Sequence, residues 1–366
     1  MASLETPSAD FSAALRHYRE IVDSRMKAFF EDRIRESDGF LKSAYSYLAD
    51  YVLNGGKRLR PVLAILAYQA AGGRDEDAIA LPAVGIELFH NSSLIHDDIM
   101  DEDAERRGML TIHKHFEKRF LEGHKEKRLR GRIFGKLSER FGVSMAILQG
   151  NILYALTERC FTESSFGADA VRRALSAVHH TYRVICEGQM GDILSDLRRD
   201  VTEEEYLGMI ERKTAYLFKT AVEVGAILGG AADRQIDALS RFGFALGTAF
   251  QLQDDLIDLD PELKGRAYGS DIRQGKFTLL MIKAFAKADG NGKRRLRSAL
   301  GNDRADCRTI RAAVGVLRAT GAVDDVNALA RRKIAESRSE LVRAGLADGP
   351  RMSFEKLADL LAEREL

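Results

Sequence analysis

Proline is scarce in this chain. Only five of the 366 residues are proline, and positions 83 to 260 contain none. Because proline is the residue that most reliably breaks a helix, its absence permits long helices there. The signs of strands are missing as well, since no segment shows sustained alternation of apolar and polar residues and no Asn-Gly pair joins β-branched runs. These absences argue against a β-sheet protein.

Cysteine is also scarce. Cys160, Cys186 and Cys307 are too few and too far apart for a disulfide framework or a zinc site, which favours a reducing compartment. The first ten residues lack the basic and apolar regions of a signal peptide. No uninterrupted apolar run approaches the ~18 residues needed to cross a bilayer. We therefore expect a cytoplasmic protein with no transmembrane segment.

Neither sign of charge predominates. The chain has 56 Lys and Arg against 55 Asp and Glu, a formal net charge of +1. Proteins dedicated to nucleic-acid binding usually have a large basic excess. The balance therefore argues against nucleic acid as the partner.

Apolar residues recur at intervals of three and four, the spacing of one face of a helix. Such series run through residues 41–52, 81–95 and 236–246. The chain is therefore predicted to be all-α, with about a dozen helices.

No change of composition and no Gly/Ser/Pro linker divides the chain. We expect a loose N-terminus over residues 1–10 and a single domain over 11–366. Within it, the glycine pair at 55–56 indicates the end of one helix, Pro61 indicates the start of the next, and Thr202 begins an N-terminal capping pattern.

The segment 113–140 differs from the rest in its charge. It contains ten Lys or Arg against four acidic residues, and glycines at 123, 131 and 135 interrupt any long helix. We expect a solvated basic insertion. Two alternatives remain open: a patch that gathers an anionic substrate or makes weak contact with an anionic membrane surface, and, less favoured, a nucleic-acid contact.

Two aspartate-rich segments point to chemistry. The first aspartate motif is LIHDDIMDEDAERRG at 94–108, and the second aspartate motif is FQLQDDLIDLD at 250–260. Residues four apart share a face of a helix, so Asp97 and Asp101 form one pair of carboxylates. Asp254 and Asp258 form a second pair. One such motif is compatible with a solvated helix face, but two, each within apolar sequence, indicate bound cations.

The chemistry of the donors selects the cation. Carboxylates without histidine or cysteine are hard oxygen ligands that suit Mg²⁺, which is commonly shared with substrate phosphates. Groups able to hold phosphates occur elsewhere in the chain and at the end of the first aspartate motif: Lys57, Arg60, Arg106 with Arg107, Lys213 with Thr214, and Lys276. Arginine suits forked phosphate contacts and lysine a point charge, so this set can hold two diphosphates.

These motifs together resemble the trans-isoprenyl diphosphate synthases of the polyprenyl synthetase family. The resemblance runs from Gly55 to Thr278 through GGKRLRP, His90 seven residues before the first aspartate motif, EGQMGD at 187–192, Lys213-Thr214 and GSDIRQGKFT at 269–278. It implies a single large helical bundle around a deep central cavity, usually as a homodimer. It also implies about three Mg²⁺ ions per active site, with Mn²⁺ able to substitute.

The resemblance assigns roles by position. Isopentenyl diphosphate would be held by Lys57, Arg60, His90 and Arg107. The allylic diphosphate would be held by Arg106, Lys213, Thr214, Gln251 and Lys276. Arg266, which stands where the family commonly has lysine, keeps that charge and would also bind substrate. Principal metal ligands would be Asp97, Asp101 and Asp254, with Asp98, Asp255 and Asp258 supporting them directly or through water. Gln189 and Asp192 would stand behind the site.

The implied reaction is prenyl transfer. Departure of the allylic diphosphate, assisted by Mg²⁺ and by Lys213, Lys276 and Arg106, leaves a carbocation that the double bond of isopentenyl diphosphate attacks. The departing diphosphate then takes the proton. A terpene cyclase and a non-catalytic subunit of a heteromeric synthase are the alternatives. The first is expected to lack GGKRLRP, and the second to have lost an aspartate motif.

Product length is expected to depend on the helix that leads into the first aspartate motif. The family's chain-length position, five residues before the first aspartate, is the small Ser92, and Phe89 lies one turn deeper. We therefore expect products of about twenty to thirty carbons, with a geranylgeranyl or somewhat longer chain at the centre of that range.

Overall fold

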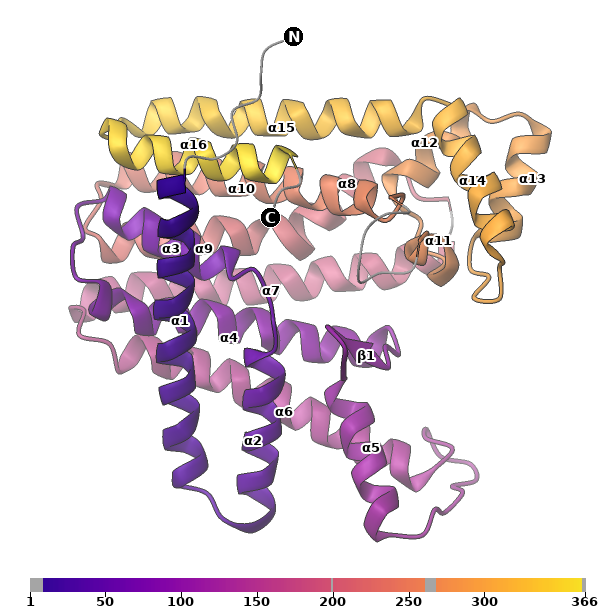
Figure 1. Ribbon diagram of the computed structural model, residues 1–366, viewed down its shortest axis with the longest axis horizontal. Helices are drawn as coiled ribbons and strands as arrows, with labels where there is room; N and C mark the ends of the chain where they lie inside the picture. The colour runs from indigo at the N-terminus through magenta and orange to yellow at the C-terminus, as the bar shows by residue number, and fades with distance from the viewer. Residues whose placement is uncertain (1–8, 199, 261–267, 364–366) are drawn as a thin grey trace. The chain divides into compact units, whose positions relative to one another are not determined.

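The computed structural model describes residues 9–198, 200–260 and 268–363, and most of them are helical (Figure 1). The chain divides into two compact units, which we describe separately. The N-terminal unit comprises Ser8–Ile65 and Arg74–Leu175, and the C-terminal unit comprises Leu66–Gly73 and Ser176–Leu366. The prediction of an all-α chain is confirmed.

The N-terminal unit consists of helices and one short β-hairpin. Its elements are α1 (Ala9–Arg35), α2 (Gly39–Leu53), the start of α3 (Leu59–Ala70), α4 (Glu76–Met100), β1 (Glu105–Arg106), β2 (Met109–Leu110), α5 (Ile112–Gly123), α6 (Leu137–Thr162) and the start of α7 (Ala168–Arg198). The central helix is α4, which packs along α6 and contacts α1. A cluster of aromatic rings, including Phe116 and Phe141, joins α5 to α6.

Helix α4 is the one described helix that is long and apolar enough to span a membrane by length and composition. Polar residues interrupt the apolar sequence of α4, so the helix contains no long uninterrupted apolar run. Of its most apolar stretch, 78% is buried inside the structure. That burial is typical of the core helix of a protein that packs around it.

The C-terminal unit is formed by the later helices. Its elements are the rest of α3 and α7, then α8 (Glu203–Ile210), the π-helical turn η1 (Glu211–Ala215), α9 (Tyr216–Leu228), α10 (Asp233–Ile257), α11 (Ser270–Gln274), α12 (Leu279–Lys287), α13 (Gly290–Ala299), α14 (Cys307–Ala319), α15 (Ala322–Ala344) and α16 (Asp348–Glu363). Helix α10 packs against α9, α15 and α16, and α15 and α16 lie side by side in Figure 1.

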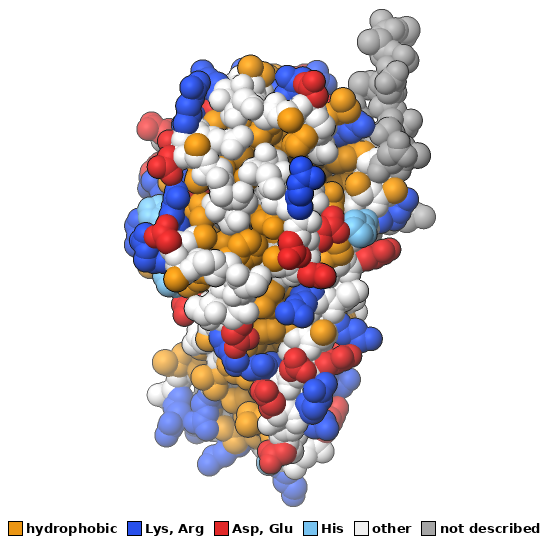
Figure 2. All heavy atoms as spheres, turned by 90° about the vertical axis from the view of Figure 1, so that its left-hand side faces the viewer, with side chains coloured by type: hydrophobic (Ala, Val, Ile, Leu, Met, Phe, Trp, Pro, Cys, Tyr) orange, Lys and Arg blue, Asp and Glu red, His pale blue; other side chains and the backbone are white. Residues whose placement is uncertain are grey.

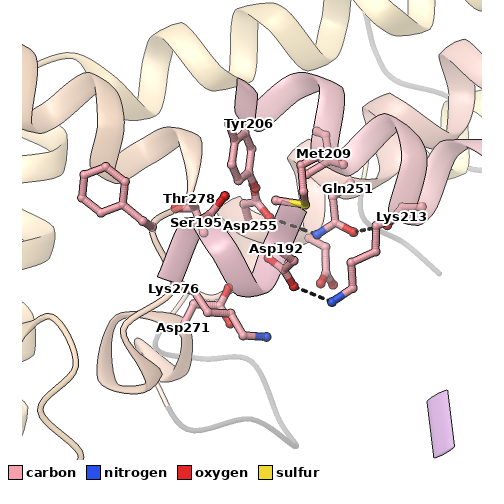
Figure 3. A pocket seen from close by; sticks show the side chains of 14 residues that line it. Asp192, Ser195, Tyr206, Met209, Lys213, Gln251, Asp255, Asp271, Lys276 and Thr278 are labelled. Carbon is pink, nitrogen blue, oxygen red and sulfur yellow. Dashed lines mark hydrogen bonds and ion pairs between the residues drawn. The ribbon is translucent and has the colours of Figure 1, made fainter. Parts of the chain in front are cut away.

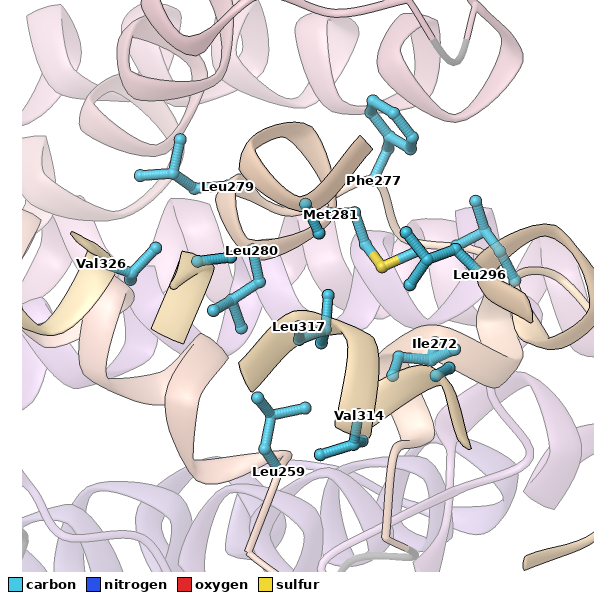
Figure 4. Close-up of a cluster of buried hydrophobic side chains, with 14 of the residues drawn as sticks. Leu259, Ile272, Phe277, Leu279, Leu280, Met281, Leu296, Val314, Leu317 and Val326 are labelled. Carbon is cyan, nitrogen blue, oxygen red and sulfur yellow. The ribbon is translucent and has the colours of Figure 1, made fainter. Parts of the chain in front are cut away.

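A cluster of buried apolar side chains fixes the segment that follows the second aspartate motif (Figure 4). Ile272, Phe277, Leu280 and Met281 pack there with side chains of α13, α14 and α15. Because these residues bracket Lys276, their burial holds that lysine in a defined place.

The structure refines the sequence predictions at several points. It contains sixteen α-helices among the described residues, more than expected, because short helices such as α11 have no room for a periodic pattern. Helix α3 begins at Leu59, so Pro61 lies in its first turn. The capping pattern at Thr202 is confirmed, since its hydroxyl accepts from the backbone N–H of Glu205 at 3.2 Å.

The basic segment is only partly a solvated loop. Residues 112–123 form α5, whose Phe116 is fully buried, and α6 begins at Leu137. The solvated connection is therefore 124–136. Elsewhere the two signs of charge are mixed, and Figure 2 shows basic and acidic side chains interspersed over the face that it draws. The expectation of one domain over 11–366 stays a prediction.

Candidate active site

The first aspartate motif ends α4 and leads into the β-hairpin. Asp98 is buried, and its carboxylate accepts hydrogen bonds from Tyr51 Oη at 2.7 Å and from Arg106 Nε. Asp97 and Asp101 are partly exposed, and Asp101 caps the helix. The buried aspartate thus fixes the end of α4 to α2 and to the hairpin, while the pair at four-residue spacing remains accessible.

The hairpin explains the Arg-Arg-Gly sequence. Arg107 and Gly108, between β1 and β2, both have positive φ values, 51° and 75°. A two-residue turn with this backbone matches the twist of paired strands, and glycine adopts it at least cost. Arg107 donates from Nη1 to the backbone oxygen of Asn54 at 3.2 Å, and Asn54 Nδ2 donates to the oxygen of Arg107 at 3.0 Å. The hairpin is therefore fastened to the end of α2.

The GGKRLRP segment places a second group of cations nearby in the same unit. Arg58, which the sequence analysis did not single out, is buried and forms ion pairs with Asp23 at 2.8 Å and Glu87 at 2.7 Å. A Cβ atom at Gly56 would lie 3.0 Å from Arg58 Nη1 and 3.2 Å from Arg107 Nη1. The glycine therefore makes room for two guanidinium groups.

Positive charge converges on His90 in this group. Arg60 Nη1 donates to His90 Nε2 at 3.2 Å. The pKa of His90 is lowered well below its usual value, because burial and then the charges of Arg60 and Arg107 oppose a proton on the ring. His90 is thus neutral, and the arginines around it attract an anion. Lys57 is exposed in the adjacent loop. We call Lys57, Arg60, His90 and Arg107 the arginine–histidine cluster.

The C-terminal unit contains a pocket at the second aspartate motif (Figure 3). Its empty volume is about 610 Å³, including open space at its mouth. Fourteen residues line it: Asp192, Ser195, Tyr206, Met209, Ile210, Lys213, Thr214, Gln251, Asp254, Asp255, Asp271, Lys276, Phe277 and Thr278. The sequence-predicted Asp254, Lys213, Thr214, Gln251 and Lys276 are thus brought together. Asp271 and Tyr206 were not singled out.

Asp255 lies at the wall of the pocket and is engaged within the protein. It accepts hydrogen bonds from Tyr206 Oη and from Gln251 Nε2, the latter at 3.1 Å. Gln251 Oε1 in turn accepts from Thr214 Oγ1 at 2.8 Å. Burial raises the pKa of Asp255 to about 8. The hydrogen bonds that link Tyr206, Asp255, Gln251 and Thr214 position α10 against α8 and η1.

Asp258 is occupied in another way. Its carboxylate accepts from the backbone N–H groups of Ser270 at 2.9 Å and Asp271 at 3.1 Å, at the start of α11. Its side chain is absent from the pocket lining, whereas Asp271 is present. Asp192, Asp254 and Asp271 thus bring carboxylates from three segments to the pocket, and the expected pairing of Asp254 with Asp258 at a cation stays a prediction.

Lys213 sits on the π-helical turn η1 and pairs with Asp192 of α7 at 2.6 Å. Such turns often occur at functional sites. The approach of α7 depends on Gly188, where a Cβ atom would lie 2.5 Å from the backbone nitrogen of Lys213. Gln189, next in the same motif, is buried, and its Nε2 has no hydrogen-bond partner among the described residues.

Two further sets of predicted residues have distinct outcomes. Ser92 Oγ donates to the backbone oxygen of Gly150 at 2.8 Å, and Phe89 meets the ring of Tyr154 edge-on at 5.9 Å, so both lie between α4 and α6. Both side chains are fully buried. Arg266 lies outside the described residues.

The donor set of the pocket fits a hard divalent cation. Its carboxylates are accompanied by no histidine or cysteine. No group of three Asp, Glu, His or Cys side chains in the described part of the chain is arranged to hold a metal alone. Mg²⁺ is commonly held by one or two carboxylates with substrate phosphates completing its shell, so the set fits an ion that arrives with a diphosphate.

Comparisons with known proteins show which family the chain belongs to. A profile described as polyprenyl synthetase matches residues 42–317. The short chain isoprenyl diphosphate synthase of Methanothermobacter thermautotrophicus is 36% identical over 96% of this chain and 98% of its own. The geranylgeranyl diphosphate synthase of Methanosarcina mazei is 36% identical over 89% of this chain and 90% of its own.

Solved structures extend the likeness to the fold. The geranylgeranyl pyrophosphate synthase of Corynebacterium glutamicum, complexed with isoprenyl diphosphate and magnesium, has a TM-score of 0.85 and 29% identity over 95% of this chain and 98% of its own. The match therefore includes both aspartate motifs and nearly the whole length of each protein. The chain belongs to the polyprenyl synthetase family and is a prenyl-transferring enzyme with the all-α isoprenoid synthase fold.

Proposed function

We propose that the chain is a Mg²⁺-dependent trans-prenyltransferase that condenses isopentenyl diphosphate with an allylic diphosphate. The observation that supports this most directly is the pocket of the C-terminal unit, in which Lys213 and Lys276 accompany Asp192, Asp254 and Asp271. Carboxylates and lysines in one pocket suit a diphosphate that binds together with divalent cations.

The allylic diphosphate binds in this pocket. Lys213 and Lys276 supply fixed positive charge to its oxygens, and Asp254 is the principal carboxylate for the cation. The family resemblance assigns Asp97 and Asp101 of the first aspartate motif as further metal ligands, and it implies about three ions, which Mn²⁺ can replace. Bound Mg²⁺ supplies Lewis-acid stabilisation of the charge that develops on the leaving diphosphate.

The buried aspartates Asp98 and Asp255 position the metal ligands next to them and keep their own hydrogen bonds within the protein. Asp98 stays with Tyr51 and Arg106, and Asp255 stays with Tyr206 and Gln251. The family resemblance assigns Arg106 to the allylic diphosphate, and Asp98 holds the Arg106 side chain. Gln189 offers its amide group as a donor at the same motif as Asp192.

Isopentenyl diphosphate binds at the arginine–histidine cluster. Arg60, Arg107 and Lys57 bind its oxygens, and neutral His90 holds Arg60 in place. Its double bond attacks the allylic carbon, and the released diphosphate accepts the proton that is lost. No described side chain in either group needs to act as a nucleophile.

The product has about twenty to thirty carbons, with the geranylgeranyl length at the centre. Support comes from the relative named as a geranylgeranyl diphosphate synthase and from the small Ser92 with Phe89 one turn deeper. Phe89 and Tyr154 together form the floor against which the growing tail stops.

The enzyme acts in the cytoplasm as a homodimer. Helix α7 exposes a stripe of apolar side chains at Met190, Ile193, Leu194 and Leu197, with exposed fractions from 42% to 78%. Residues three and four apart share a helix face, so this stripe suits a second copy. Light scattering with Leu194→Glu and Leu197→Glu tests it: a stable dimer in the double variant contradicts this interface.

The activity is tested with the purified chain alone. Isopentenyl diphosphate and geranyl or farnesyl diphosphate are supplied with Mg²⁺, and the product is measured by mass. We expect an elongated prenyl diphosphate, its loss in EDTA, and recovery with Mg²⁺ or Mn²⁺. A released hydrocarbon instead identifies a terpene cyclase. An inert chain that becomes active only with a second protein identifies a subunit of a heteromeric synthase.

A further inference from the structure

The connection between α5 and α6, residues 124–136, forms an ordered finger that we call the basic loop. Its two sides are joined by backbone hydrogen bonds from Leu129 N to Gly135 O at 2.8 Å and from Leu137 N to Lys127 O at 2.9 Å. Neither aspartate motif includes any part of it. The basic loop is therefore a structured element to which the proposed reaction assigns no role.

The charge of the basic loop is strongly one-sided. It contains six Lys or Arg and one acidic residue, Glu126. Glu126 accepts hydrogen bonds from the backbone and side chain of Ser138, so its charge is used at the base of the loop. Lys136 pairs with Glu139 at 3.0 Å. Five basic residues remain, of which Arg128, Arg130 and Arg132 lie at the tip or next to it.

Three arginines of the loop are exposed: Arg130 and Arg132 at the tip, and Arg128 on the paired stem next to it. Within the described part of the chain, none of them forms an ion pair or a side-chain hydrogen bond. An internal partner would have neutralised them. Their common exposure instead favours an external anion with a broad surface.

An apolar side chain projects from the same tip. Ile133, which follows Arg132, is 96% exposed, the highest fraction among the exposed large hydrophobic residues of the described structure. Burying such a side chain is favourable, and nothing in the described chain covers it. A single exposed isoleucine needs no explanation by itself, but here it stands among three arginines.

The base of the loop is rigid. Phe116 and Phe120 of α5 each contact the ring of Phe141 in α6, at centroid distances of 6.2 and 5.6 Å. This packing fixes the directions of the two helices that hold the loop. The tip is thus presented at a defined position on the N-terminal unit.

We propose that the basic loop docks the enzyme on a bilayer that contains anionic lipids. Arg128, Arg130 and Arg132 lie at the headgroups, and Ile133 enters the boundary between headgroups and acyl chains. Nucleic acid is less favoured as the partner. A phosphate backbone offers no apolar contact for the exposed Ile133, and the adjacent Phe134 is partly buried and therefore less accessible for stacking on a base. The docking itself requires no substrate, whereas its use, delivery of a long-chain amphiphilic product to lipid, rests on the proposed function.

Vesicle flotation of the full chain tests the proposal, without substrate, so that its result is independent of the proposed activity. Vesicles of phosphatidylcholine alone are compared with vesicles that contain phosphatidylglycerol. We expect binding only to the anionic vesicles, and weakening by salt. Because each basic residue near such a surface contributes roughly fivefold to binding, Arg128→Gln/Arg130→Gln/Arg132→Gln should reduce affinity at least about tenfold.

A matched control removes the same charge elsewhere. Arg294→Gln/Arg295→Gln/Arg304→Gln changes three exposed arginines around α13, where no exposed large hydrophobic residue accompanies them. We expect less than about a twofold effect on vesicle binding from this control. Ile133→Ser should weaken binding mainly at high salt, because the apolar contact is not screened. Condensation in detergent solution should be unchanged in all three variants.

Several results would overturn the proposal. Absence of wild-type binding to the anionic vesicles at about 0.1 M salt does so. So does an equal loss of binding in the α13 control, which means that net charge alone matters. If the same three arginines instead hold a DNA or RNA oligonucleotide more tightly than the vesicles, and Ile133→Ser has no effect on either, the loop is a nucleic-acid contact.

Discussion

Tyr206 donates its phenolic hydrogen to Asp255, and Tyr51 does the same to Asp98. In each aspartate motif, the second residue of the Asp-Asp pair is thus buried against a tyrosine from another helix. The arrangement separates two positions, because the buried aspartate fixes the helix end while the preceding one, Asp97 or Asp254, is partly exposed.

Loss of the partly exposed first aspartate of either motif should stop turnover. In Asp254→Ala or Asp97→Ala, we expect kcat/KM to fall about 10²-fold or more, because one electrostatic contact to a developing charge has about this effect. The melting temperature should not change. Asp237→Ala, an exposed aspartate earlier on α10, is the control and should remain within about twofold of the wild type. Retention of more than half the rate in both variants at saturating Mg²⁺ contradicts the assignment.

Loss of a tyrosine hydroxyl should lower stability. Tyr51→Phe and Tyr206→Phe each leave a buried carboxyl group without one hydrogen-bond partner, which reduces the free energy of unfolding by about 1–3 kcal/mol. Urea denaturation measures the change. Tyr45→Phe on α2 is the matched control, because its hydroxyl has no hydrogen bond among the described residues. Equal stability of Tyr51→Phe and Tyr45→Phe argues against the role of the Tyr51–Asp98 contact.

The two substrates should respond to different cations. Arg60→Gln should raise KM for isopentenyl diphosphate about tenfold or more, and Lys276→Gln should do the same for the allylic substrate, since each removes a charged hydrogen bond. Steady-state kinetics with one substrate varied at a time separates the effects. Each variant serves as the control of the other. If both raise the same KM, the assignment of the two diphosphates is wrong.

Product length should depend on the Phe89–Tyr154 contact. Phe89→Ala or Tyr154→Ala removes one ring of the pair, which opens space between α4 and α6 for a longer tail. Mass analysis should show a shift to longer products. Ser92→Ala, which removes only a hydrogen bond to Gly150, is expected to leave the distribution unchanged. An unchanged distribution in both ring variants places the floor elsewhere.

Acid should destabilise the N-terminal unit through His115. Burial lowers the pKa of His115 to about 4, from a usual value of 6.5. As the pH falls below about 6.5, the unfolded chain binds a proton that the folded chain does not, so stability decreases. His115→Phe retains a ring against Tyr47 and should flatten the decrease between pH 6.5 and about 5 in urea denaturation. An identical slope in the variant refutes the linkage.

Local sequence patterns predicted the helical fold, and they singled out the partly exposed residues to which the proposal assigns metal and diphosphate binding. Asp97, Asp101, Asp254, Lys213 and Lys276 follow from short motifs whose spacing is local. The roles of the buried aspartates do not, because Tyr51 precedes Asp98 by 47 residues and Tyr206 precedes Asp255 by 49. Partners so distant in sequence become visible only when the helices pack.

Other differences have equally specific causes. Asp271 was not singled out because it lies outside both aspartate motifs, and its place at the pocket depends on the backbone hydrogen bonds from Ser270 and Asp271 to the carboxylate of Asp258. Helix α5 was hidden by the many basic residues of its segment, although Phe116 and Phe120 already had helical spacing. That interpretation gave more weight to the basic composition of the segment than to the helical spacing of its phenylalanines. The burial of Phe116 shows that the spacing was the better predictor.

Gly188 shows how an uncharged position can mimic a catalytic one in mutagenesis. Any side chain there would collide with the backbone of η1 and push α7 away, separating Asp192 from Lys213 while leaving every ionisable group in the protein unchanged. A screen of random substitutions would record position 188 as intolerant and inactive. The cause of that intolerance would be the close approach of α7 to η1. Results of alanine scanning in the EGQMGD motif must therefore be interpreted with this spacing in view.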